Sequence, residues 1–497
     1  MKKLSMIIVL TVLVGGSAYA QDKAAIKYAS TITAQDMRSK LTILASDEME
    51  GRETGEKGQK MAAEFLSKFY ADLGMTAPSE GTYYQKFDLY QTDWTGVTLK
   101  TKNGQQKNGD TFVFRGNGDM KREAKIFTVF AGAGSEADFE GIDLTDKGVI
   151  IIPEGNNSND AVIRAKAANA KAIFIGSGTN EEFAKRLPRL SRSALKTRLR
   201  LTENRDADEN LTFYISNEMA ADLLNTTAEK LTAAMSDSKS IKGRTVRTFV
   251  KRTINAVATE NMVAFIEGTD LKDEVLVLSS HFDHIGQNAD GTVINNGADD
   301  DGSGTTAVME LAEAFKQAAN EGNGPRRSIL FLNVTGEEKG LLGSDYYGSH
   351  PLFPLENTVN NLNIDMIGRV DPDHEDNPNY VYAIGSEKLS SHLKIISEYA
   401  NITYTNIDLD YRYDDPEDKN RFYYRSDHYN FAKHGIPIIF YFNGTHADYH
   451  RPSDTVDKIE FDLMANRTRL IFHTAWLLAN RDERTPVDKE DDMTYNR

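Results

Sequence analysis

Hydrophobic residues in the second half of the chain follow two alternating patterns. Short apolar runs, of the length and composition of buried strands, occupy residues 262–266, 274–280, 328–334, 361–368 and 436–442. Helical spacing appears between and after them, at Thr305–Phe315, where Val308 and Leu311 share a face, and at Phe461–Asn480. Strands that alternate with helices favour parallel pairing. We therefore predict an α/β fold with a mixed, largely parallel central sheet flanked by helices.

The first half of the chain contains a second, different set of patterns. Met61, Phe65, Phe69 and Leu73 recur at helical spacing, and Tyr83–Tyr90 has the composition of a strand. Further on, the chain carries three short apolar runs and one helical segment, at 148–152, 171–175, 211–215 and 160–170. These elements predict a small β-rich unit with its own core.

The patterns divide the chain into segments. We expect residues 21–95 and 256–480 to build one domain and residues 96–255 to form an inserted, smaller β-rich domain. Residues 481–497 are polar and are expected to form a disordered tail. A basic stretch, Lys185–Arg200, contains no acidic residue. We interpret it as a solvated loop, and a contact surface for an acidic partner is the alternative.

The amino terminus has the pattern of an export signal. Met1-Lys2-Lys3 precedes an apolar run that is too short to span a membrane comfortably, and small residues lead up to Ala20. We expect residues 1–20 to be a signal peptide, so that the mature protein is periplasmic or secreted and is not embedded in a membrane. The chain has no cysteine, which excludes a disulfide scaffold, a thiol nucleophile and a lipid-modified cysteine. Its net charge of -16 makes nucleic acid an unsuitable partner.

Metal-ligand residue types stand at the ends of the predicted strands of the second half. They are His281, the pair Glu337 and Glu338, Asp365, and the region His446–His450, while the loop Asp299–Asp301 adds three carboxylates. Parallel strands bring such ends together at one sheet edge. Two ions need a shared carboxylate, further ligands for each ion and a base for water. The recurrence therefore predicts a di-metal hydrolase site.

Each of these segments also has an ordinary interpretation. A single histidine at a strand end is often structural, and paired glutamates can complement a helix dipole. The loop beginning at Asp299 fits the calcium-loop pattern of an EF-hand through Glu310, but the residues before it are typical of a turn instead of a helix. Asp365, inside an otherwise apolar run, is harder to explain without a partner. Taken together, the segments favour the metal site.

Six motifs in this order resemble peptidase family M28, a family of zinc aminopeptidases. They are Ser280-His-Phe-Asp, Gly297-Ala-Asp-Asp-Asp-Gly-Ser-Gly, Thr335-Gly-Glu-Glu-Lys-Gly, Asn363-Ile-Asp-Met-Ile-Gly, Arg425-Ser-Asp-His and Tyr449-His-Arg-Pro-Ser-Asp-Thr. The early stretch Leu44-Ala-Ser-Asp-Glu-Met-Glu-Gly-Arg-Glu-Thr-Gly is similar to that of secreted members. The resemblance implies a zinc-exopeptidase-like fold. It also implies that the inserted unit is a protease-associated domain.

The resemblance implies a role for each motif residue. Asp300 would bridge two zinc ions, His281 and Asp365 would bind one of them, and Glu338 and His450 would bind the other. Glu337 would be the general base, and Asp283 would orient His281. Asp301 is expected to shape the loop, and the remaining histidines, His284, His428, His434 and His446, are placed outside the metal ligands. A mixed carboxylate and imidazole shell would accept cobalt or manganese as well as zinc.

The implied activity is removal of amino-terminal residues from peptides by a water held between the ions. Its partners would be peptides or proteins with a free amino terminus. A carboxypeptidase or dipeptidase of the same fold is the alternative, with Arg369 or Arg425 as the cation for a substrate carboxylate. Glutaminyl cyclases share the fold but hold one zinc, which disagrees with the presence of both His281 and Asp365. A non-catalytic, receptor-like relative disagrees with the intact ligand set.

Overall fold

The computed structural model describes residues 21–490, except for 117, 156–157, 196–197 and 203–210. The predicted signal peptide and the last residues of the predicted tail therefore lie outside the described residues. Within the described part, no helix is both long and apolar enough to cross a membrane. The chain divides into two compact units: residues up to 87 combine with those from 258 onward, and residues 88–257 form the second unit. Both boundaries fall inside long strands, β1 (Tyr84–Thr101) and β9 (Arg244–Ile266).

The main unit is built on a mixed sheet. Its strand order is β14 (Asp408–Asp410), β13 (Tyr380–Ile384), β15 (Ile438–Phe442), β12 (Thr358–Ile364), β10 (Leu271–His281), β11 (Arg327–Val334) and the last part of β9. The central strands β15, β12, β10 and β11 pair in parallel, whereas β9 and β13 join them antiparallel. The prediction of a mixed, largely parallel central sheet is confirmed.

Helices cover both faces of this sheet. One core contains residues of α1 (Lys23–Ala29), α2 (Ala34–Leu44), α3 (Lys57–Asp72), α9 (Gly304–Asn320), α11 (Leu393–Ala400) and α13 (Phe461–Asn480). The other core contains residues of α10 (Leu342–Ser349) and α12 (His428–Ala432). Neighbouring strand residues point to opposite cores, as Leu276 and Val277 do, because side chains alternate along a strand. The layers explain why the strands read as continuous apolar runs.

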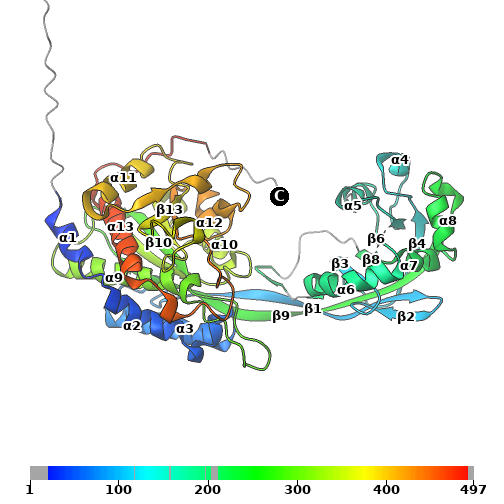
Figure 1. The fold of residues 1–497 in the computed structure, drawn as a ribbon, viewed down its shortest axis with the longest axis horizontal. Helices are drawn as coiled ribbons and strands as arrows, with labels where there is room; N and C mark the ends of the chain where they lie inside the picture. Colours follow the sequence, from blue (N-terminus) through cyan, green and yellow to red (C-terminus); the bar gives the residue numbers. More distant parts are fainter. Residues whose placement is uncertain (1–20, 117, 156–157, 196–197, 203–210, 491–497) are drawn as a thin grey trace, which may run out of the picture. The chain divides into compact units, whose positions relative to one another are not determined.

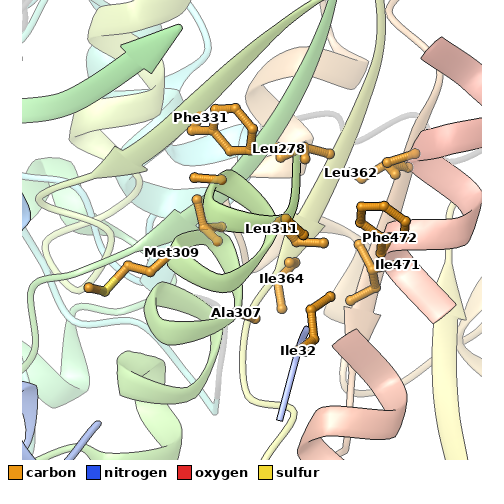
Figure 2. Close-up of a cluster of buried hydrophobic side chains, with 14 of the residues drawn as sticks. Ile32, Leu278, Ala307, Met309, Leu311, Phe331, Leu362, Ile364, Ile471 and Phe472 are labelled. Carbon is orange, nitrogen blue, oxygen red and sulfur yellow. The ribbon is translucent and has the colours of Figure 1, made fainter. Parts of the chain in front are cut away.

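Helix α9 is the central element of the larger core. It lies beside α13 in the main unit (Figure 1). Figure 2 shows Leu311 of α9 among Leu278 and Leu362 of the sheet and Ile471 and Phe472 of α13. The loop Ala298–Ser303 leads directly into the first turn of α9. Packing of this helix therefore fixes the position of the three consecutive aspartates.

The second unit has a parallel sheet of its own. Strands β4 (Ala124–Phe130), β5 (Gly148–Ile151), β6 (Ala172–Gly176) and β8 (Leu211–Ile215) pair in parallel, with β3 (Val113–Gly116) antiparallel to β8 and the first part of β9 antiparallel to β4. Strands β2 (Gly104–Lys107) and β7 (Leu199–Arg200) pair with β1. The helices are α4 (Glu136–Phe139), α5 (Ser158–Ala167), α6 (Asn180–Leu195), α7 (Asn217–Leu223) and α8 (Ala228–Ala233). Separate apolar clusters fill this unit.

Two expectations about polar segments are wrong. The basic stretch predicted as a loop is helical up to Leu195, as part of α6. Phe183, Leu187 and Leu190 repeat at helical spacing there, and Phe183 is buried, so the segment has an apolar face. The expected disordered tail is ordered as far as residue 490. Thr485, for example, donates a hydrogen bond to Asn360 at 2.9 Å and is buried.

Shortening one side chain of α9 tests this packing. Leu311→Ala leaves a cavity among sheet and helix residues, so the free energy of unfolding should fall by about 2–5 kcal/mol. Ile395→Ala on α11 removes a side chain that is 60% exposed and should cost less than about 1 kcal/mol. Urea denaturation of both variants measures the difference. Equal losses would contradict the central position of Leu311.

Candidate metal centre

The side chains of the candidate site come from neighbouring strand ends. His281 is the last residue of β10 and pairs in register with Val334, the last residue of β11, which leads to Glu337 and Glu338. Asp365 directly follows β12, the other neighbour of β10. Parallel pairing thus delivers these groups to one edge of the sheet.

The geometry brings the predicted residues together around Asp300. The Nε2 of His281 lies 3.3 Å from Oδ1 of Asp300 and 3.6 Å from Oδ1 of Asp365. On the other side, Nε2 of His450 lies 3.0 Å from Oδ2 of Asp300 and 3.2 Å from Oε1 of Glu338. The two oxygens of Asp300 therefore face different groups of side chains.

Glu337 stands beside the first of these groups. One of its carboxylate oxygens is 4.0 Å from Nε2 of His281. His281, Glu337 and Asp365 form one set whose ligand atoms all lie within 4.8 Å of each other. His284, Asp300 and Glu338 form a second such set. Both sets combine imidazole and carboxylate groups, which suit a divalent ion of borderline softness.

Several of the candidate ligand atoms also lack hydrogen-bond partners among the described residues, which leaves them available to a metal ion. Oδ2 of Asp300, Oε1 of Glu338 and both ring nitrogens of His284 are buried, and no described residue forms a hydrogen bond with them. Buried polar atoms normally have such a partner. Atoms that bind one zinc ion at about 2.0–2.2 Å lie roughly 3–3.6 Å from their neighbours in the shell, and the separations around Asp300 match this spacing. The residues present fit two divalent cations.

Burial and charge separate the pKa values of the two adjacent glutamates. Burial raises the pKa of Glu337 well above its usual range, and the negative charges of Glu338 and Asp365 add to this effect. Burial would also raise the pKa of Glu338, but contacts with His284 and His450 lower it to about 2. The pKa of Asp300 is lowered in the same way as that of Glu338. Neighbouring histidines hold it well below the ordinary value despite burial. Glu337 is the strongest base of the three carboxylates.

Asp283 lies where it can position both His281 and Glu337. The Nδ1 of His281 is 3.0 Å from the backbone oxygen of Asp283 and 3.7 Å from its carboxylate. The carboxylate accepts hydrogen bonds from the backbone N–H of Glu337 at 3.2 Å and from the hydroxyl of Thr54 at 2.7 Å. Asp283 thus links the end of β10 to the loop after β11.

The neighbours of Asp300 in sequence shape the loop. The carboxylate of Asp301 accepts hydrogen bonds from the backbone N–H groups of His281, Gly304 and Met366, at 2.8–3.1 Å. Asp299 accepts one from Gly368 N–H at 2.6 Å and lies 3.1 Å from Nε2 of His446.

The calcium-loop interpretation fails at its twelfth position. That ligand would be Glu310, but its carboxylate is paired with Lys40 at 2.5 Å on helix α9. The oxygens of Asp301 at the third position are already used by backbone N–H groups. The described side chains therefore do not provide this type of calcium site.

Sequence reasoning left two residues of the site without a role. The sequence predicts that His284 lies outside the metal ligands, yet its Nδ1 is 2.9 Å from Oε1 of Glu338 and 3.8 Å from Oδ2 of Asp300. Its proximity to His281 in the chain was the available signal. The other residue is Arg52, which lies in the early stretch that begins at Leu44 and to which the sequence assigns no role in the site.

Arg52 binds backbone carbonyl groups close to the aspartate loop Ala298–Ser303. Its guanidinium is 1% exposed and donates to the backbone oxygens of Phe282 at 2.8 Å, Asn296 at 2.7 Å and Gly297 at 3.0 Å. It also donates to Leu44. Burial lowers the pKa of Arg52, while the charges of Asp300, Asp301 and Asp283 oppose that effect. The side chain therefore connects the backbone directly after His281 to the backbone that precedes the aspartates, and it brings positive charge near the carboxylates.

A pocket opens beside the first group of side chains. Asp300, Glu337 and Asp365 line it together with Met366, Phe422, Arg425, Phe440, Phe442, Thr445 and Tyr449. Arg425 donates a hydrogen bond to the Tyr449 hydroxyl at 3.2 Å. Arg369, the other cationic candidate, pairs with Asp448 at 3.0 Å. The pocket thus combines aromatic walls, carboxylates and one arginine.

The fold is that of the zinc aminopeptidases. An aminopeptidase from an Aneurinibacillus strain aligns over 94% of this chain and 99% of its own, with a TM-score of 0.55 and 18% identity. A zinc aminopeptidase from Bacillus subtilis aligns over 93% of this chain and 99% of its own, with a TM-score of 0.51 and 17% identity. These likenesses establish the architecture.

Residues 261–475 match the model of peptidase family M28. A probable zinc metalloprotease of Leptosphaeria maculans is 30% identical over 41% of this chain and 53% of its own length. Leucine aminopeptidase 1 of Penicillium rubens is 26% identical over 50% of this chain and 63% of its own length. The chain thus spans between half and two thirds of the length of these curated relatives.

Replacing Arg52 tests its role beneath the loop. Arg52→Lys keeps the charge but cannot make the same set of hydrogen bonds, so buried carbonyl oxygens lose their donors. The free energy of unfolding should fall by about 3 kcal/mol. Arg326→Lys is the matched control, because Arg326 pairs with Asp270 at the surface and should change stability by less than about 1 kcal/mol. Denaturant titration at a fixed metal concentration compares them, and an unchanged Arg52→Lys would refute the role.

Proposed function

We propose that this protein is a metallopeptidase that uses two divalent ions, zinc in its native form, to remove amino-terminal residues from peptides. The observation that carries the proposal is the convergence of two ligand groups on opposite oxygens of Asp300, beside the buried base Glu337. The zinc metalloprotease and aminopeptidase names of the curated relatives support it.

The proposed assignment gives each ion a set of residues. His281, Asp300 and Asp365 would hold the first ion, and Asp300, Glu338 and His450 would hold the second. When bound, such ions polarise a peptide carbonyl and lower the pKa of water. Asp283 acts indirectly, by orienting His281 and anchoring the backbone of Glu337.

Glu337 would move the proton during peptide hydrolysis. As general base it accepts a proton from the attacking water, and it then donates that proton to the leaving amine. Its burial, which raises the pKa of its carboxyl group, makes it a stronger base than an exposed glutamate. Glu338, one residue further on, keeps its negative charge for metal binding because the pKa of its carboxyl group is about 2.

The charge of the pocket favours a substrate amino group. Asp300, Glu337 and Asp365 line it, and carboxylates attract the cationic amino terminus of a peptide. A carboxypeptidase or dipeptidase is the second candidate, because Arg425 is exposed and lines the same pocket. A glutaminyl cyclase would need only one ligand group, and a receptor-like relative would need neither.

The proposal extends to the location of the enzyme. The signal sequence predicted at residues 1–20 would export the chain, so its peptides would be met in the periplasm or outside the cell. The unit at 88–257 would be a protease-associated domain inserted into the peptidase.

Replacing the proposed base separates chemistry from metal binding. Glu337→Gln should retain both ions but lose turnover by about 100-fold or more, because the amide cannot accept the proton. Glu313→Gln on α9 is the matched control, since Glu313 is exposed and lies outside the site. Metal content by atomic emission and turnover of a peptide amide are measured on both. Near-normal turnover in Glu337→Gln would refute the assigned base.

A peptide panel tests the direction of cleavage. Free peptides should be cleaved stepwise from the amino terminus, whereas acetylated ones should resist, and a chelator should abolish activity. Mass spectrometry of the products identifies the residue removed. Cleavage of acetylated peptides from the carboxyl end, with loss of affinity in Arg425→Met, would favour the carboxypeptidase alternative instead.

A further inference from the structure

His284 is a buried histidine whose ring has no ordinary partner. It follows the end of β10 by three residues, is fully buried, and its backbone N–H donates to the carbonyl of Arg52 at 3.1 Å. Within the described part of the chain, neither ring nitrogen has a hydrogen-bond partner. Leaving a buried polar group unsatisfied costs about 1–3 kcal/mol. The hydrogen-bonding capacity of the ring is therefore left unused by the described residues.

The ring faces the second group of ligands. Its Nδ1 lies 2.9 Å from Oε1 of Glu338 and 3.8 Å from Oδ2 of Asp300. Although Nδ1 and Oε1 are so close, neither atom takes part in a hydrogen bond with any described residue. Two close polar atoms that are not bonded to each other can share a third partner. A cation that both atoms bind satisfies this condition.

The imidazole ring of His284 packs closely against the backbone of Gly297. A Cβ atom at residue 297 would come within 2.6 Å of Cγ and Cδ2 of His284. The residue also has a φ of +55°, in the left-handed region that favours glycine. Gly297 immediately precedes the aspartate loop, and its carbonyl binds Arg52. The same backbone thus holds both the aspartates and the imidazole.

We propose that His284 is an additional ligand of the second metal ion, through Nδ1, together with Asp300, Glu338 and His450. The inference rests on the proposed two-ion function and adds a residue to it. Four side chains would then hold the second ion, whereas His281, Asp300 and Asp365 would hold the first ion beside Glu337. The two ions would therefore differ in their number of imidazole ligands.

The first test measures metal binding by the full-length protein. His284→Phe preserves a ring of similar size but removes the nitrogen. In calorimetric titration of the metal-free protein with Zn²⁺, affinity for the second ion should fall by more than about 100-fold, while the first ion binds as before. Loss of a residue that only orients a ligand costs 10–100-fold. A smaller loss would therefore overturn the assignment.

A control variant tests whether the loss of any buried imidazole weakens metal binding, and a second measurement does not depend on folding of the variant. His428→Phe removes another buried imidazole, whose Nε2 faces the carbonyl of Tyr423 at 2.8 Å, and should leave both affinities unchanged. X-ray absorption at the zinc edge of the unmodified protein counts imidazole ligands directly. It should detect His281, His284 and His450, and a count that accounts for His281 and His450 alone would overturn the proposal even if His284→Phe misfolds.

The same data separate this inference from the proposed function. Binding of both ions with the smaller imidazole count refutes the role of His284 and leaves the two-ion peptidase standing. Failure of the unmodified protein to bind a second ion would overturn both. Binding of both ions with the larger count, and loss of the second ion in the variant, supports both.

Discussion

The structure of the main unit depends on the compensation of several buried, neighbouring carboxylates by positive or hydrogen-bond-donating groups. Asp283, Asp300, Asp301, Glu337 and Asp365 meet at one edge of the sheet, and most of them are fully buried. Burying unpaired charges of one sign is very costly. Three kinds of positive partner lower this cost: backbone N–H groups around Asp301, the guanidinium of Arg52, and the imidazoles around Asp300. The two cations that we propose would complete the compensation, and the fold and the metals would then stabilise each other.

The parallel pairing of the strands brings these carboxylates together with the histidines at one edge of the sheet. Because β11 and β12 flank β10 and run in the same direction, the segments that follow them end beside His281. The aspartate loop is then held from several sides. Its N–H groups donate to Asp454, its side chains accept from the segment after β12, and Arg52 binds its preceding carbonyls. A change in any one of these supports would move Asp300 relative to both ligand groups.

The sequence predicts the parts of this arrangement that are local. Apolar runs identify β10, β11, β12 and β15, and polar residues directly after them identify the ligand candidates. Arg52 was not predictable, because its partners Phe282 and Gly297 are far away in the chain and are backbone atoms, which leave no mark on residue type. His284 was missed because motif comparison assigns roles only to motif positions. Helix α6 was misread because its charge obscured the spacing of Phe183, Leu187 and Leu190.

The same packing gives the adjacent residues Glu337 and Glu338 different proposed roles, as general base and as metal ligand. Glu337 and Glu338 are chemically identical and neighbours in the chain, so only their surroundings can distinguish them. Glu338 points to His284 and His450, which keep it ionised. Burial, and after it the neighbouring carboxylates, favour the protonated form of Glu337. A metal ligand needs a permanent negative charge, whereas a general base needs a pKa near the pH at which the enzyme works. If His284 lost its imidazole, Glu338 would become more like Glu337, and the separation of ligand from base would weaken at the same time as metal binding.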